Sequence, residues 1–106
     1  SGISIEHLLD QNTIDSLIQR TRDGGAEILN LKQKSSAYDA PGAAVTIMVE
    51  AIVHNKHRLL PCITMLEGEY GQNDIAIGVP VVLGENGVEK IVELDFTVDE
   101  KKAFDA

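Results

Sequence analysis

One segment of this 106-residue chain is a helix candidate that is apolar on nearly every side. It runs from about Pro41 to Lys56 and follows a loop of small and polar residues at 36–40. Proline is tolerated at a first helical position, where its missing N–H has no partner in any case. From position 45 to 53 only Thr46 and Glu50 interrupt the apolar residues. A helix that is apolar all round is buried all round, so we expect another domain or subunit to cover it.

The composition is that of one folded domain with an acidic surface. Hydrophobic residues make up 43% of the chain and charged residues 25%, which is ordinary for a globular protein. Seventeen Asp and Glu against nine Lys and Arg give a formal net charge of −8, which opposes binding to phosphate backbones and anionic lipids. No stretch approaches the roughly 20 apolar residues of a membrane span. We therefore expect no nucleic-acid and no membrane partner.

The chain offers few groups for catalysis or metal binding. Cys62 is the only cysteine, which excludes an intramolecular disulfide and predicts a buried structural thiol in a cytoplasmic protein. His54 and His57 share a helical spacing, but no Asp, Glu or Cys obviously completes a metal site. We interpret them as basic residues that complement the carbonyl end of the helix. No nucleophile elbow, phosphate loop or Gly-x-Gly-x-x-Gly turn is present, so the sequence predicts no metal site and shows no active site.

The first third of the chain predicts helices. Ser4 is expected to cap a short helical turn that ends at Leu9, and Asn12 or Thr13 is expected to cap the next helix. Gly24-Gly25 stands in the middle of that helix, and each glycine weakens a helix by about 1 kcal/mol relative to alanine. We expect a kink or a close packing contact at these glycines, and no domain boundary.

The second half predicts an antiparallel meander and a final helix. Strands are expected at 59–66, 75–83 and 88–96, with Pro61 at a strand start or edge and the second strand broken by Gly78 and Pro80. A hairpin is expected at 84–87, because Asn-Gly tolerates positive φ. Thr97 and Glu100 form a capping box that opens the last helix. Helices, then a three-stranded meander, then a helix predict an α+β fold.

Six runs of the sequence resemble one known family. They are Gln19–Ile28, Ser36–Ala44, Leu60–Cys62 with Leu66–Gly71, Gly78–Gly84 and Asn86–Ile91. In this order and without large gaps, they resemble the C-terminal, substrate-side domain of the lactate/malate dehydrogenase superfamily, nearest the lactate-dehydrogenase-like malate dehydrogenases. The resemblance implies that residues 1–106 are that domain, a fragment seen without the nucleotide-binding Rossmann domain.

The resemblance also implies an NAD-dependent enzyme that moves a hydride between malate and oxaloacetate. In this family the catalytic histidine belongs to a Gly-His-Gly-Asp-type motif just upstream of where this chain begins. The substrate-binding arginines and the Gly-rich nucleotide loop lie further upstream. His7 matches no catalytic position, so we expect no catalytic residue here, an inactive fragment, and NAD bound mainly by the absent domain.

Two residues of this chain match positions near the reaction chamber of the family. Ala37 falls where a small residue lies beside the substrate, and lactate-type members usually carry Thr there. Pro41 falls where an apolar residue approaches the nicotinamide. The small side chain of Ala37 leaves room for a 2-oxo or 2-hydroxy dicarboxylate, and the apolar ring of Pro41 excludes water. Plain loop and helix-start packing is the alternative interpretation. Ser35 replaces a usual Gly and Asp39 a usual Tyr, which changes loop geometry and charge at this point.

Two other functions stay open at this stage. The chain is also compatible with a lactate or other 2-hydroxyacid dehydrogenase, since some of these enzymes carry an Ala-Pro loop. A non-catalytic assembly domain of the same fold is the third hypothesis. Family members are commonly dimers or tetramers, so the resemblance implies a homo-oligomer in each case.

Overall fold

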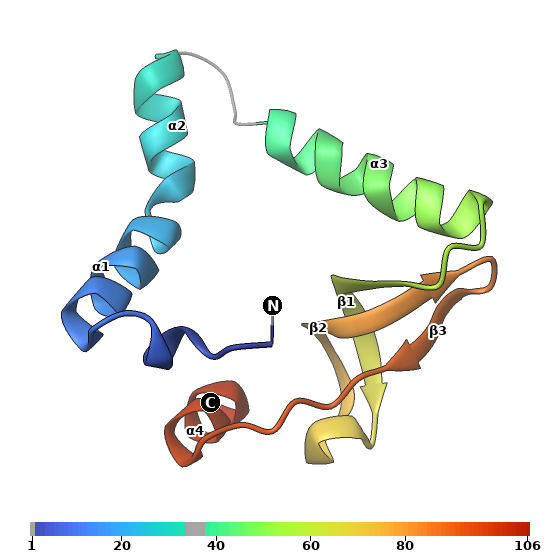
Figure 1. Cartoon of the computed structure of the whole chain (residues 1–106). Helices are drawn as coiled ribbons and strands as arrows, with labels where there is room; N and C mark the ends of the chain where they lie inside the picture. The colour runs from blue at the N-terminus through green and yellow to red at the C-terminus, as the bar shows by residue number, and fades with distance from the viewer. Residues whose placement is uncertain (1, 34–37) are drawn as a thin grey trace. The chain divides into compact units, whose positions relative to one another are not determined.

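A computed structural model describes residues 2–33 and 38–106 (Figure 1). The chain divides into two compact units, Ser1–Gly42 and Ala43–Ala106. Helices and one antiparallel sheet make up the described residues, which confirms the expected α+β fold. The elements are η1 (Ile5–His7), α1 (Gln11–Arg22), α2 (Gly24–Lys32), α3 (Asp39–Val53), β1 (Arg58–Glu67), η2 (Glu69–Gly71), β2 (Asn73–Gly84), β3 (Gly87–Ile91) and α4 (Val98–Asp105).

Asp10 is the cap of α1 in the first unit. Its Oδ1 accepts a hydrogen bond of 2.7 Å from the backbone N–H of Thr13, and this bond lowers the pKa of the Asp10 carboxyl. The prediction of Asn12 or Thr13 as the cap is therefore wrong, because the helix begins before both residues. Ser4 precedes the single turn η1 but makes no capping hydrogen bond with its side chain.

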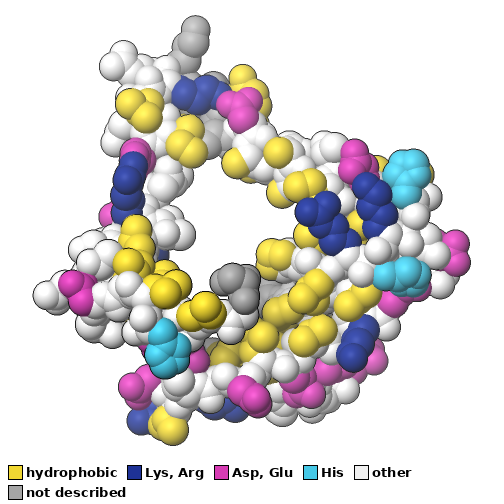
Figure 2. Space-filling view, in the orientation of Figure 1, with side chains coloured by type: hydrophobic (Ala, Val, Ile, Leu, Met, Phe, Trp, Pro, Cys, Tyr) yellow, Lys and Arg dark blue, Asp and Glu magenta, His cyan; other side chains and the backbone are white. Residues whose placement is uncertain are grey.

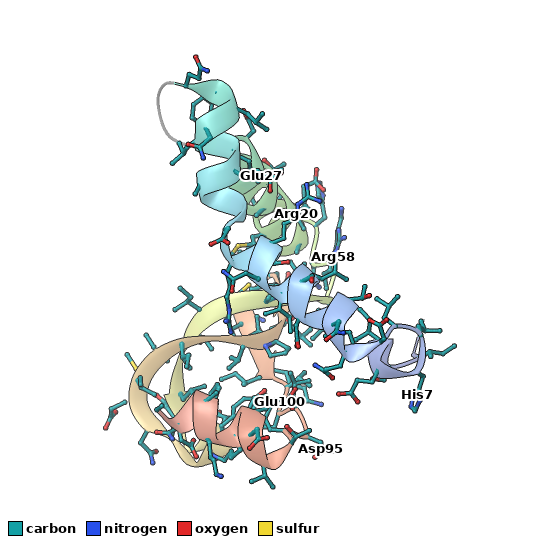
Figure 3. All side chains as sticks on the ribbon, turned by 90° about the vertical axis from the view of Figure 1, so that its left-hand side faces the viewer. His7, Arg20, Glu27, Arg58, Asp95 and Glu100 are labelled. Atoms are coloured by element: carbon teal, nitrogen blue, oxygen red, sulfur yellow. The ribbon has the colours of Figure 1, made fainter. Side chains whose placement is uncertain are left out.

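The Gly24-Gly25 pair marks a break between two helices. Asp23 ends α1 and precedes α2, and a Cβ built on either glycine would meet no heavy atom within 4 Å. The expected kink is thus confirmed, while a close packing contact is absent at these two residues. Arg20 spans the break, since its Nε and Nη2 donate to the Glu27 carboxylate at 3.2 and 2.9 Å (Figure 3). This exposed ion pair therefore links α1 to α2 across the break.

The second unit contains the predicted meander. The strand order is β1-β2-β3 with antiparallel pairing throughout. Contrary to expectation, β2 continues through Gly78 and Pro80. Pro80 lies opposite Pro61, and its carbonyl accepts from the N–H of Val92, on the β3 side. The proline pair is therefore a non-hydrogen-bonded pair, so neither missing N–H interrupts the β1–β2 ladder.

The expected hairpin joins β2 to β3, with only its glycine at positive φ. Gly87 has φ +83°, whereas Asn86 is not among the described residues with positive φ. A register shift between Val82 and Leu83 accompanies the turn. A left-handed glycine beside such a shift is typical of a G1 bulge. β3 then ends at Ile91, five residues before the predicted end of the strand.

The core of the second unit lies on one face of the sheet. Its buried residues are Ala51, Cys62, Leu66, Tyr70, Val79, Val81 and Leu83. Cys62 is buried, as expected, and burial raises the pKa of its thiol. Tyr70 stacks on Phe96 and Phe104 with ring centroids 5.3 and 5.0 Å away. Phe104 comes from α4, whose predicted capping box of Thr97 and Glu100 is present.

Tyr70 forms hydrogen bonds that attach the segment after β3 to this core. Its hydroxyl donates to the carbonyl of Val92 at 2.6 Å and accepts from the N–H of Leu94 at 3.0 Å. The Tyr70 N–H donates to the Glu93 carboxylate at 2.6 Å. Three hydrogen bonds from one residue therefore fix the segment that connects β3 to α4.

Candidate functional site

The candidate site is the start of α3, where Pro41 was expected to open the helix. The helix instead begins at Asp39, so Pro41 is its third residue. The first four N–H groups of a helix have no intrahelical partner, so proline is tolerated there as well. The N–H of Gly42 donates to the carbonyl of Tyr38 at 2.9 Å and closes the first turn. Pro41 is exposed.

A small charged cluster surrounds this helix start. Lys32 Nζ lies 3.2 Å from Asp39 Oδ2 and 4.0 Å from the ring centroid of Tyr38. Asp39 stands in the first turn of α3 and Lys32 in the last turn of α2, where each charge complements its helix dipole. The negative charge that Asp39 brings to the site is thus paired with a lysine of the same unit.

Sequence reasoning missed Lys32. The residue is seven positions from Asp39, and residues 33–38 separate their helices. Helical periodicity does not extend across a connecting segment, so no local sequence pattern predicted the ion pair between Lys32 and Asp39. Ala37, Ser35 and Ser36 lie outside the described residues. The role that the resemblance assigns to Ala37 therefore stays a prediction, and Pro41 is the one matched residue with a described position.

The two neighbouring histidines do not lie in α3, which ends at Val53. The interpretation of His54 and His57 as the basic last turn of a helix is therefore wrong. His57 Nδ1 instead lies 2.8 Å from Glu89 Oε2. Asn55 Oδ1 accepts from the N–H of Glu85 at 3.0 Å, so the loop after α3 is bonded to the β2–β3 hairpin. Within residues 2–33 and 38–106, no group of three or more His, Cys, Asp or Glu could hold a metal ion.

The helix that carries Pro41 is poorly covered in this structure. Ala51 is its only buried residue, and Met48 and Ile52 pack against the core. Val45, Val49 and Val53 are exposed by half or more and share one helical face. The expectation that the helix has more apolar surface than its own unit covers is confirmed for the described residues. None of the described helices has both the length and the apolarity to cross a membrane.

The α+β fold agrees with the family that the sequence resembles. Residues 1–106 match the family model of the lactate/malate dehydrogenase alpha/beta C-terminal domain. The chain therefore belongs to the lactate/malate dehydrogenase family.

The similar curated proteins are malate dehydrogenases. The chain is 58% identical over 104 residues to the malate dehydrogenase of Nitrosococcus oceani, which covers 98% of the chain and 33% of the relative. It is 53% identical over 105 residues to that of Thioalkalivibrio sulfidiphilus, covering 99% and 34%. The chain thus spans about a third of the length of these relatives.

Solved structures share the fold over nearly the whole chain. Malate dehydrogenase from Salinibacter ruber matches with a TM-score of 0.92 at 44% identity, covering 98% of this chain and 34% of that one. Lactate dehydrogenase from Eimeria maxima, solved with NADH and oxamate, matches with a TM-score of 0.91 at 34% identity, with the same coverage. Both kinds of dehydrogenase therefore use this fold.

Proposed function

We propose that this chain is the C-terminal, substrate-side domain of an NAD-dependent malate dehydrogenase, which interconverts malate and oxaloacetate by hydride transfer. One observation carries the proposal: relatives named malate dehydrogenase match 97–99% of the chain at 49–58% identity. Among the solved structures, malate dehydrogenases match at 36–46% identity and lactate dehydrogenases at 34 and 38%. The names of the curated relatives therefore support malate as the substrate more strongly than the structural neighbours do.

In this proposal the chain shapes the reaction chamber and supplies no catalytic residue. The catalytic histidine, the arginines that bind the substrate and most contacts to NAD come from the preceding domain. Pro41 would present an apolar ring to the nicotinamide, and the exposed position of that ring is compatible with the role. Ala37 would leave space for the second carboxylate of a dicarboxylic acid. The whole enzyme would be a cytoplasmic homo-oligomer of the tricarboxylic acid cycle.

Lys32 has a supporting role in the same proposal. A dicarboxylate that approaches the start of α3 would be repelled by an unpaired Asp39. The ammonium of Lys32, 3.2 Å from the Asp39 carboxylate, offsets that charge. The departure from the usual Tyr at this position is therefore compatible with an anionic substrate.

A chimera tests the proposal. The chain replaces the C-terminal third of the Nitrosococcus oceani malate dehydrogenase, and NADH oxidation is followed with oxaloacetate and with pyruvate. We expect turnover of oxaloacetate well above that of pyruvate, and no oxidation of NADH by the 106-residue chain alone. The unmodified relative and a chimera with the Eimeria maxima lactate dehydrogenase segment serve as controls.

The outcomes separate the three hypotheses. A folded chimera that prefers pyruvate would contradict malate and favour a lactate-type enzyme. A chimera that melts cooperatively, binds NADH and turns over neither substrate would favour the non-catalytic assembly domain. Circular dichroism and NADH fluorescence report folding and cofactor binding independently of turnover.

A further inference from the structure

Asn86 and Gly87 lie at the turn of the hairpin that joins β2 to β3 (Figure 1). Asn86 is exposed. A Cβ built on Gly87 would meet no heavy atom within 4 Å, so the space around its backbone is open. Gly84 and Gly87 are the last pair of the β2–β3 ladder, and the end of a ladder opens more readily than its middle. The side chain of Asn86 and the nitrogen of Gly87 can therefore meet when this end opens.

An asparagine can react with the nitrogen of the residue that follows it. The Gly87 nitrogen loses its proton and attacks Asn86 Cγ, and the side-chain nitrogen leaves as ammonia. The product is a cyclic imide, which water opens at either of its two carbonyl carbons. Opening at Cγ gives aspartate, whereas opening at the main-chain carbonyl gives isoaspartate, in which the chain runs through Cβ and Cγ. Water is the co-reactant, and nothing is oxidised or reduced.

The residue that follows distinguishes Asn86 from the other asparagines of the chain. These are Asn12, Asn30, Asn55 and Asn73, which precede Thr13, Leu31, Lys56 and Asp74. A Cβ on the following residue crowds the nitrogen that must attack, and glycine has no Cβ. Of the five asparagines, only Asn86 precedes a glycine, so we expect it to react first.

Two contacts, one on each side of Asn86, join the hairpin to the loop after α3. Asn55 Oδ1 accepts from the N–H of Glu85 at 3.0 Å, and His57 Nδ1 lies 2.8 Å from Glu89 Oε2. Histidine and acidic side chains are visible next to each other at this surface (Figure 2). An isoaspartate at position 86 would insert an extra main-chain atom between Glu85 and Glu89. The two contacts would then no longer fit the loop together.

The charge of the product acts in the same direction. Asn86 Nδ2 donates a long hydrogen bond to Glu89 Oε1, at 3.5 Å. Either product would lose this donor and place a carboxylate near that of Glu89. Like charges repel, and the chain already carries a net charge of −8.

We propose that Asn86 is a site of spontaneous deamidation, and that its isoaspartate form detaches the β2–β3 hairpin from the loop after α3. The proposal concerns a covalent change of the chain itself and is independent of the proposed catalytic function. Asn86→Ser removes the reacting amide and gives the control that cannot deamidate at this position. Asn86→Asp reproduces the charge of the aspartate product without the altered main chain.

Peptide mapping by mass spectrometry tests the site. The 106-residue chain and Asn86→Ser are incubated at neutral and at mildly alkaline pH. We expect the peptide that contains Asn86 to gain the mass of deamidation before any other asparagine peptide, and faster at the higher pH. Asn86→Ser should show no change at this position. Deamidation of another asparagine first, or an Asn86 that stays intact throughout, would overturn the site.

Thermal melts test the structural consequence. The isoaspartate form is separated from the unreacted chain by chromatography, and circular dichroism verifies that the unreacted chain is folded. We expect the isoaspartate form to melt lower than the unreacted chain by about 4 °C or more, and Asn86→Asp to melt between the two. An isoaspartate form that melts with the unreacted chain would overturn the detachment. One that melts with Asn86→Asp would assign the loss to charge and overturn the role of the altered main chain.

Discussion

Lys32 Nζ lies 3.2 Å from Asp39 Oδ2, so an ion pair joins the last turn of α2 to the first residue of α3. The same ammonium lies 4.0 Å from the Tyr38 ring centroid, which adds a cation–π contact. The ion pair therefore connects the C-terminal end of α2 to the N-terminal end of α3, the helix that carries Pro41. These two ends have opposite dipole signs. This relationship leads to the first prediction.

Replacing Lys32 by alanine should loosen this bridge. We expect a coupling energy with Asp39 of about 0.2–1 kcal/mol, because the Asp39 carboxylate is well exposed and water screens the pair. A double-mutant cycle of Lys32→Ala and Asp39→Asn, measured by urea unfolding, gives this value. Salt should reduce it. A coupling energy that is zero at low salt would show that the two side chains act independently.

Tyr70→Phe should destabilise the second unit. The substitution keeps the aromatic ring but removes the hydroxyl that bonds Val92 and Leu94. We expect a loss of about 0.5–1.5 kcal/mol in the free energy of unfolding, because the part-buried carbonyl of Val92 and N–H of Leu94 lose their partner. Tyr38→Phe is the control, since Tyr38 is 61% exposed and its hydroxyl makes no hydrogen bond to the residues that the structure describes. Equal effects of the two substitutions would argue against the role of the Tyr70 hydroxyl.

Gly84→Ala should be poorly tolerated, in contrast to Gly78→Ala. A Cβ at Gly84 would collide with the Glu89 carboxylate and lie 2.8 Å from Asn55 Oδ1. Both side chains can turn away, so the substitution costs the contacts that they make with His57 and with the N–H of Glu85, about 1 kcal/mol. Gly78→Ala adds a methyl group in open space on the same strand. Thermal melts of the two variants compare them directly, and similar melting temperatures would contradict the prediction.

Acid should weaken the fold through several carboxylates. Hydrogen bonds from Thr13 lower the pKa of Asp10, and those from Lys101 and Gln72 lower the pKa of Asp105. A carboxyl with a lowered folded-state pKa stabilises the protein above its unfolded pKa. That contribution disappears as the pH falls through the folded-state value, here below about pH 4.

The urea concentration at the midpoint of unfolding, compared at pH 6 and pH 3, measures this loss of stability. Asp10→Asn keeps a residue that can cap α1 but does not titrate, so its midpoint should fall less between the two pH values. A fall as large as that of the unsubstituted chain would show that Asp10 contributes nothing to the pH dependence.

Ala37→Thr in the chimera should move substrate preference toward pyruvate. The larger side chain would fill the space proposed for the second carboxylate of oxaloacetate. One badly placed group in a pocket changes specificity by about 1–3 kcal/mol, or roughly 10–200-fold in kcat/KM. Ala40→Thr at the adjacent helix start is the matched control. An unchanged ratio of kcat/KM for oxaloacetate and pyruvate would remove Ala37 from the proposed site.

Local chemistry explains which parts of the fold could be predicted. The capping box at Thr97 and the hairpin around Gly87 depend on residues a few positions apart, and both are present. The cap at Asp10 was missed because several neighbouring polar residues can cap a helix. Strand β2 was predicted to break at Pro80 because proline lacks an N–H for the sheet. Whether that loss interrupts a ladder depends on which neighbouring strand the nitrogen faces, and the sequence does not give this.

The sequence by itself determined the order of elements, the acidic character, the buried thiol of Cys62 and membership of the dehydrogenase family. These follow from periodicity, composition and motifs, which act over a few residues. Only the tertiary structure decided that Lys32 pairs with Asp39, that Pro61 lies opposite Pro80, and that Ile63 stands beside Gly78. Such contacts join residues that are distant along the chain, so their energies depend on register and packing, which no local pattern encodes.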